Sequence, residues 1–101
     1  MSYFMRDLMG GAVDEPDPAM MKRVLSSLAE ADDEHPDVSL THESGWCLSA
    51  FHGGLVIWEH PEDGSVAPRE IREVALEEVL RLFGLLAVGD IASIEALPWK
   101  M

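Results

Sequence analysis

The segment of residues 46–60 constrains the fold more than any other part of this chain, because its pattern is typical of a β-hairpin. Two glycines, Gly53-Gly54, separate two runs rich in apolar residues. Both glycines accept the positive φ angles of a two-residue hairpin turn, which would pair Phe51 with Val56 and Ser49 with Trp58. We therefore expect an antiparallel sheet that contains this hairpin.

The predicted register sorts the hairpin residues onto two faces, since directly opposed residues share a face of a sheet. The first face collects Trp46, Leu48, Ala50, Leu55 and Ile57, and the second collects Cys47, Ser49, Phe51, Val56 and Trp58. Upstream, a three-residue loop over 43–45 with Gly45 in the left-handed conformation adds Val38 and Leu40 to the first face. A two-residue loop would place Leu40 on the second face. The longer loop is preferred because it makes the first face continuous.

Helix signals stand on both sides of the predicted strands. Asp17 suits an N-cap and Pro18 the first position of a helix that ends near Ala31. Its apolar stripe consists of Met21, Val24, Leu25 and Leu28. A second helix over 76–88 carries a stripe broad enough to lie on a sheet, and Asp90 is a natural N-cap for a short last helix.

These elements predict the fold class. Residues 66–72 can add a fourth strand, which Pro68 restricts to an edge. Residues 1–11 are open to three interpretations: an edge strand, a short helix or a loosely attached segment. With 101 residues there is room for a single domain over 1–101 with one modest core. We predict an α+β fold: an antiparallel three- to four-stranded meander with an N-terminal helix and one or two C-terminal helices packed on one face.

The charge distribution narrows the choice of partner. The formal net charge is −12, and the 45 residues from Val24 to Pro68 contain nine Asp or Glu but no Lys or Arg. Such a surface repels bare nucleic acid and favours a basic partner, although a merely solvated acidic surface gives the same pattern. The single Cys47 rules out an intramolecular disulfide, and no signal peptide or membrane-spanning run is evident. We expect a cytoplasmic protein.

The second sheet face is the main candidate site. The predicted register gathers Phe51, Val56 and Trp58 there, beside Cys47, and the two helices already cover the first face. An uncovered apolar patch often marks a contact surface, and aromatic residues are enriched at interface cores. Three alternatives stay open: the N-terminal segment folds over the patch, a second copy or a partner binds it, or it lines a ligand pocket.

Catalytic and metal-binding patterns are weak in this sequence. Cys47 and His60 fall opposite each other in the predicted register, which is the minimum for an activated thiolate, but no third orienting group is evident. The four histidines match no metal-binding spacing, and no nucleotide-binding or hydrolase motif is present. We predict that the protein is not an enzyme and has no catalytic residues, metal or cofactor.

The general character of the chain, a small acidic α+β domain without a catalytic motif, is similar to that of the immunity proteins that neutralise bacterial toxins. This likeness is one of type and involves no shared motif. It implies a bacterial protein-binding domain that inhibits a basic toxin. The expected partner-binding residues are Phe51, Val56, Trp58, Asp32, Asp33, Glu34, Glu59, Glu62 and Asp63. The alternatives are a homo-oligomeric accessory protein that associates through the exposed sheet face, such as a homodimer, and a small enzyme built on Cys47 and His60.

Overall fold

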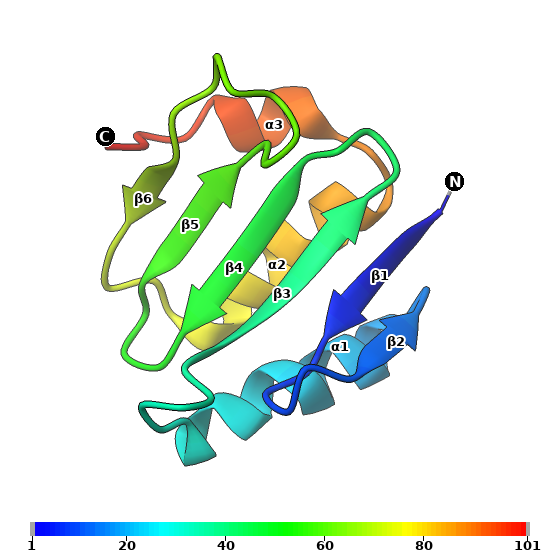
Figure 1. Cartoon of the computed structure of the whole chain (residues 1–101), viewed down its shortest axis with the longest axis vertical. Helices are drawn as coiled ribbons and strands as arrows, with labels where there is room; N and C mark the ends of the chain where they lie inside the picture. The colour runs from blue at the N-terminus through cyan, green and yellow to red at the C-terminus, as the bar shows by residue number, and fades with distance from the viewer. Residues whose placement is uncertain (1, 101) are drawn as a thin grey trace.

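A computed structural model describes residues 2–100, which form one six-stranded sheet and a layer of helices (Figure 1). The strands are β1 (Tyr3–Arg6), β2 (Ala12–Asp14), β3 (Asp37–His42), β4 (Cys47–Phe51), β5 (Val56–Glu59) and β6 (Arg69–Ile71). The helices are α1 (Pro18–Ser26), the 3₁₀ helix η1 (Ser27–Glu30), α2 (Leu76–Ala87) and α3 (Ile91–Glu95). The single domain predicted over 1–101 includes Met1 and Met101, which lie outside the described residues.

The sheet is antiparallel throughout, with the strand order β2-β1-β3-β4-β5-β6. Figure 1 shows the helices on one side of it, so the other side faces the viewer uncovered. The α+β class and the antiparallel meander, formed by β3 to β6, are therefore confirmed. The predicted three to four strands are too few, and the helix expected to be N-terminal follows two strands. Within residues 2–100, no helix is long and apolar enough to span a membrane.

Of the two additional strands, β2 lies beyond residues 1–11, and β1 comes from that N-terminal segment, which was left open between strand, helix and loose attachment. Its described part enters the sheet, because β1 pairs with both β2 and β3. Met5 lies opposite Leu40 of β3, and its side chain is fully buried in the core. Alternation along β1 then places Phe4 and Arg6 on the uncovered side.

The predicted helix signals are confirmed. Asp17 caps α1 by accepting a hydrogen bond from the Met20 backbone N–H at 2.8 Å, and Pro18 opens the helix. The helix ends earlier than predicted, at Ser26, and the chain continues as η1. Asp90 caps α3 by accepting from the Ser93 N–H. These caps satisfy N–H groups that a helix leaves unpaired at its start.

The two loops that flank β4 both contain three residues. At the first, His42 donates its N–H to the Trp46 carbonyl oxygen at 3.0 Å, and Gly45 has a φ of 95°. The preferred sequence interpretation of this loop is therefore confirmed. At the second, Phe51 donates to Leu55 at 2.9 Å, so His52, Gly53 and Gly54 form the loop. The predicted two-residue turn is wrong.

That single extra loop residue reverses the predicted orientation of β5. Ala50 lies opposite Val56, and Leu48 lies opposite Trp58. A shift of one residue moves every side chain of a strand to the other face. Val56 and Trp58 are therefore fully buried beneath the helices, whereas Ile57 lies on the uncovered side. Their predicted exposure on the second face is wrong.

Trp58 is the centre of a stack of all three tryptophans. Its ring lies parallel to that of Trp46, with centroids 4.4 Å apart, and 6.1 Å from that of Trp99. The Trp58 indole N–H donates to Glu95 of α3 at 2.8 Å, and Glu95 also accepts two hydrogen bonds from Arg69 of β6. A buried indole N–H needs such a partner. The stack fixes which face of β5 packs against the helices.

Candidate functional site: the open face of the sheet

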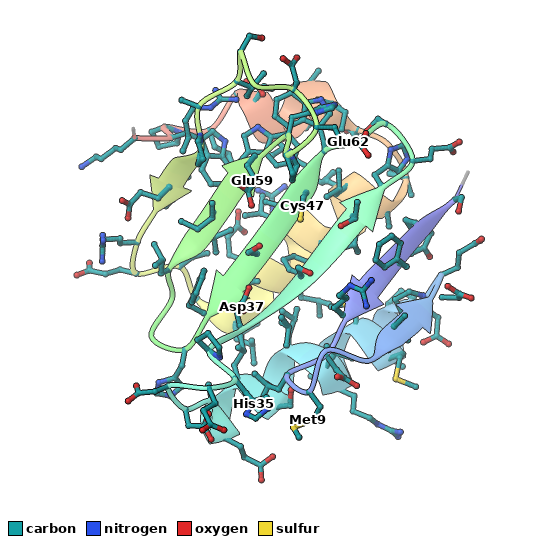
Figure 2. The ribbon with its side chains drawn as sticks, in the orientation of Figure 1. Met9, His35, Asp37, Cys47, Glu59 and Glu62 are labelled. Atoms are coloured by element: carbon teal, nitrogen blue, oxygen red, sulfur yellow. The ribbon has the colours of Figure 1, made fainter. Side chains whose placement is uncertain are left out.

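The candidate site is the uncovered side of the sheet, which we call the open face. Its members alternate along β1, β3, β4 and β5 with the core residues. On these strands they are Phe4, Arg6, Asp37, Ser39, Thr41, Cys47, Ser49, Phe51, Ile57 and Glu59. Asp14 of β2 and Glu70 of β6 lie on the same side, because they are opposite Phe4 and Ile57. Figure 2 shows Asp37, Cys47 and Glu59 on this side, spread along the sheet. The loops at either end of the strands complete its border.

Small polar side chains occupy the middle of the open face. Ser39 lies opposite Ser49, and Thr41 lies opposite Cys47. The Thr41 hydroxyl is 3.5 Å from the Cys47 sulfur. Ser49 is only 9% exposed although no helix covers it. The centre is thus low and polar, in contrast to the apolar patch expected from the sequence.

Cys47 lies opposite Glu59, so the predicted pairing of Cys47 with His60 is wrong. The His60 Nε2 atom instead lies 2.9 Å from the Ser44 carbonyl oxygen, and the imidazole meets the Trp46 ring edge-on. Burial raises the pKa of the Cys47 thiol. The thiol therefore stays protonated at neutral pH and has no histidine base beside it.

Acidic residues mark the two ends of the open face. At one end, which we call the Asp37 end, Asp37 lies opposite Phe51, and the segment 32–34 precedes it along the chain. At the other, the Glu59 end, Glu59 lies opposite Cys47, and Glu62 lies nearby in Figure 2. Along β4, from Cys47 to Phe51, the two ends are four residue steps apart, a distance of about 13 Å at the usual rise of a strand. That exceeds the Debye length at physiological salt, so the ends act as two separate negative patches.

The two acidic segments are held by hydrogen bonds from their own backbones. Asp32 accepts hydrogen bonds from the N–H groups of Glu34 and His35, and the His35 bond is the main cause of its lowered pKa. Asp63 accepts from the hydroxyl and the N–H of Ser65, and the hydroxyl bond is the main cause of its lowered pKa. Both carboxyl groups therefore stay ionised at neutral pH. The exposed Glu34 and Glu62 are carried on ordered turns.

At the β6 edge of the sheet, Arg72 forms an ion pair with Glu70. On β1, β3, β4 and β5, Arg6 is the one Lys or Arg among the open-face residues. It donates a hydrogen bond to the Gly10 carbonyl oxygen at 3.1 Å, and its guanidinium lies 5.4 Å from the centre of the Phe4 ring. This arrangement holds the cation at the β1 side of the face. The open face therefore remains predominantly acidic.

The structure separates the partner-binding residues expected from the sequence into three groups. Phe51 and Glu59 lie on the open face, and Val56 and Trp58 lie in the core. The remaining acids lie in the bordering turns: Asp32, Asp33, Glu34, Glu62 and Asp63. These acids were expected to surround one apolar centre. In the structure they lie at opposite ends of the face.

Sequence reasoning missed several members of this face. Asp37, Ser39 and Thr41 could have been placed there, because the confirmed 43–45 loop already put Val38 and Leu40 on the covered side. Phe4 and Arg6 could not, since their position depends on pairing with a strand more than thirty residues away. Among residues 2–100, no group of three or more His, Cys, Asp or Glu is placed to hold a metal ion.

Comparisons of the chain with protein-family models, with curated proteins and with solved structures returned no match. Any function of the open face must therefore be argued from the residues of this chain.

Proposed function

We propose that this chain is a protein-binding domain, most concretely an immunity-type inhibitor that binds and neutralises a basic bacterial toxin through the open face. One observation carries the proposal. A broad sheet face has no helix over it and carries carboxylates at both ends, and Arg6 is the one Lys or Arg on its β1, β3, β4 and β5 strands.

Charge complementarity selects the kind of partner. A net charge of −12 on 101 residues produces a negative field over the surface, which speeds the encounter with a basic protein and repels nucleic acid. The carboxylates of Asp37 and Glu59 stand where a partner's cations would arrive first. Association should therefore slow steeply as salt is added.

The shape of the face suits a partner that supplies the large side chains. Ser39, Thr41 and Ser49 leave the centre low, so a partner's residues can approach the sheet closely. Phe51 and Ile57 are half-buried at its border and offer apolar contact area. Aromatic and aliphatic contacts of this kind supply most of the affinity in protein interfaces, while charged pairs supply rate and specificity.

Self-association through the same face is the less favoured alternative. In a two-fold dimer each face meets its own copy, which brings two acidic surfaces together. Like charges across an interface are unfavourable. Arg6 cannot balance the acids at both ends, and Arg72 at the β6 edge is already paired with Glu70. We therefore expect the isolated chain to stay monomeric at physiological salt.

A matched pair of variants tests the proposal. Ser39→Arg places a large cation in the middle of the open face, whereas Ser26→Arg makes the same chemical change at an exposed position of α1, on the helix layer. Each variant and the wild-type chain would be immobilised, and proteins from the source cell would be captured and eluted with rising salt. We expect a basic protein that the wild-type chain and Ser26→Arg retain and that Ser39→Arg loses.

Capture that is equal for both variants would count against the open face as the binding surface. Recovery of the chain alone, as a salt-stable dimer, would favour self-association instead. Circular dichroism of each variant establishes beforehand that it is folded.

A further inference from the structure

We propose that a cavity at the Asp37 end of the open face is an anchor for the partner and receives one of its arginine side chains. This inference rests on the proposed function. This cavity lies between the β1–β2 turn and the segment that leads into β3. Its volume is about 340 Å³, and its lining includes Arg6, Asp7, Met9, Glu34, Asp37 and Ser39. Figure 2 shows Met9, His35 and Asp37 gathered at this end.

The wall formed by the β1–β2 turn is preorganised. One carboxylate oxygen of Asp7 accepts hydrogen bonds from the N–H groups of Met9 and Gly11, at 3.0 and 2.9 Å. Gly10 donates to the Asp7 carbonyl oxygen and has a φ of 81°, which suits glycine. Met9 stands at the tip of this turn and is 76% exposed. Its exposure thus follows from a hydrogen-bonded turn.

The opposite wall supplies negative charge. Glu34 and Asp37 have no ion-pair partner among residues 2–100, so both carboxylates are available to an incoming cation. Arg6 opposes them, but its guanidinium is directed to the Gly10 carbonyl oxygen and the Phe4 ring. With Asp7 included, three acids line the cavity together with Arg6 and His35, and the His35 ring nitrogen lies 3.4 Å from the Asp32 carboxylate. The acids outnumber the bases, which favours a cation.

The combination of apolar and acidic walls indicates arginine as the occupant. An exposed methionine offers a surface for the aliphatic stem, while the planar, weakly hydrated guanidinium can bind a carboxylate through two hydrogen bonds. The volume equals about eleven waters at roughly 30 Å³ each, which is ample for an arginine head and its methylene groups. A residue placed here would fix the partner at one end of the face and leave the Glu59 end for a second contact.

The test uses N-acetyl-arginine-N-methylamide as the probe and the citrulline analogue, which has nearly the same shape without the charge, as its control. Both are titrated into the ¹⁵N-labelled full chain at low salt and followed by amide chemical shifts. We expect arginine to shift the amides of 7–11 and 34–39, and the citrulline analogue to bind at least about tenfold more weakly, because charge-assisted hydrogen bonds are roughly twice as strong as neutral ones.

A pair of charge-matched variants localises the effect. Glu34→Gln should weaken arginine binding about fivefold, since an ion pair at an exposed site contributes up to about 1 kcal/mol and 1.4 kcal/mol is a factor of ten. Glu62→Gln removes the same charge at the Glu59 end and should leave binding unchanged. Equal weakening by the two variants, equal binding of citrulline, or the absence of localised shifts at the highest soluble concentration would overturn the anchor.

These results are separate from those of the capture experiment. If the anchor fails while Ser39→Arg still abolishes capture, the open face binds its partner by other contacts. If capture is insensitive to Ser39→Arg while the arginine titration succeeds, the cavity binds cations but the proposed function is wrong.

Discussion

The register of β5 determines which side chains the open face presents, and two adjacent positions test it. Val56→Ala removes two carbon atoms from a side chain that is fully buried. Their transfer is worth about 0.8 kcal/mol each, and the cavity left behind adds up to about 1 kcal/mol. We therefore expect Val56→Ala to lower the free energy of unfolding by about 1.5–2.5 kcal/mol.

Ile57→Ala is the matched control, because it removes more carbon from the neighbouring position on the opposite face. Ile57 is half-buried with no helix above it, so its loss should cost about 1 kcal/mol or less. Both variants lose a β-branched residue from the same strand, so the change in β-propensity largely cancels. The assay is urea unfolding followed by circular dichroism, with both variants fitted to a two-state transition. If Ile57→Ala costs as much as Val56→Ala or more, the register is wrong and the open face must be redrawn.

Two further predictions concern the contacts that hold the sheet to its neighbours. Glu95 accepts hydrogen bonds from Arg69 and Trp58, and those from Arg69 are the main cause of its lowered pKa. Because its side chain is 35% exposed, we expect Glu95→Gln to cost only about 1–2 kcal/mol at neutral pH. A lowered carboxyl pKa stabilises the fold above the unfolded value of about 4.3, and this contribution is lost as the pH falls through the lowered pKa of the folded state. Urea unfolding across pH 3–7 should therefore show a difference that shrinks toward low pH, and a constant difference would contradict the assignment. At the β4–β5 loop, Gly54→Ala should destabilise the fold by at least about 1 kcal/mol more than Gly53→Ala, which thermal and urea unfolding would both detect. Both glycines have a positive φ. A Cβ on Gly54 would lie 2.8 Å from the backbone nitrogen of Val74, whereas a Cβ on Gly53 meets nothing within 4 Å. Equal losses of stability in the two variants would exclude this close approach.

Local signals allowed much of the fold to be predicted. The caps at Asp17 and Asp90 each depend on residues within one helical turn, and both are present in the structure. The left-handed Gly45 was likewise predictable, because a continuous apolar face required a three-residue loop. Where one short segment determines the geometry, the sequence is a sufficient guide.

The β4–β5 loop was predicted wrongly because two loop lengths satisfy the same local rule. A glycine pair accepts positive φ in a two-residue turn, and it does so equally well as part of the three-residue loop that includes His52. The choice is decided elsewhere: the longer loop buries Val56 and places Trp58 between Trp46 and Trp99. The contact between Trp58 and Trp99, which are 41 positions apart in the chain, could not be recognised from the local pattern.

The same distinction explains how much of the site could be predicted. The acidic segments were identified, since charge is read directly from the sequence, but their position at opposite ends of the face was not. The strand β1 was left open among three interpretations because its pairing with β3 is non-local, and β2, which pairs with β1, was missed because it is only three residues long. With them, the sequence missed Arg6 and the turn that presents Met9.

Methyl-detected NMR is the most direct test of whether the open face binds a basic protein. The chain would be measured alone and in complex with the protein that the matched-variant experiment captures. Thr41 and Ile57 report on the open face, while Leu76 and the exposed Val88 report on the helix layer. We expect the methyl signals of Thr41 and Ile57 to shift or broaden on complex formation and those of Leu76 and Val88 to stay in place. Shifts confined to Leu76 and Val88 would contradict this expectation.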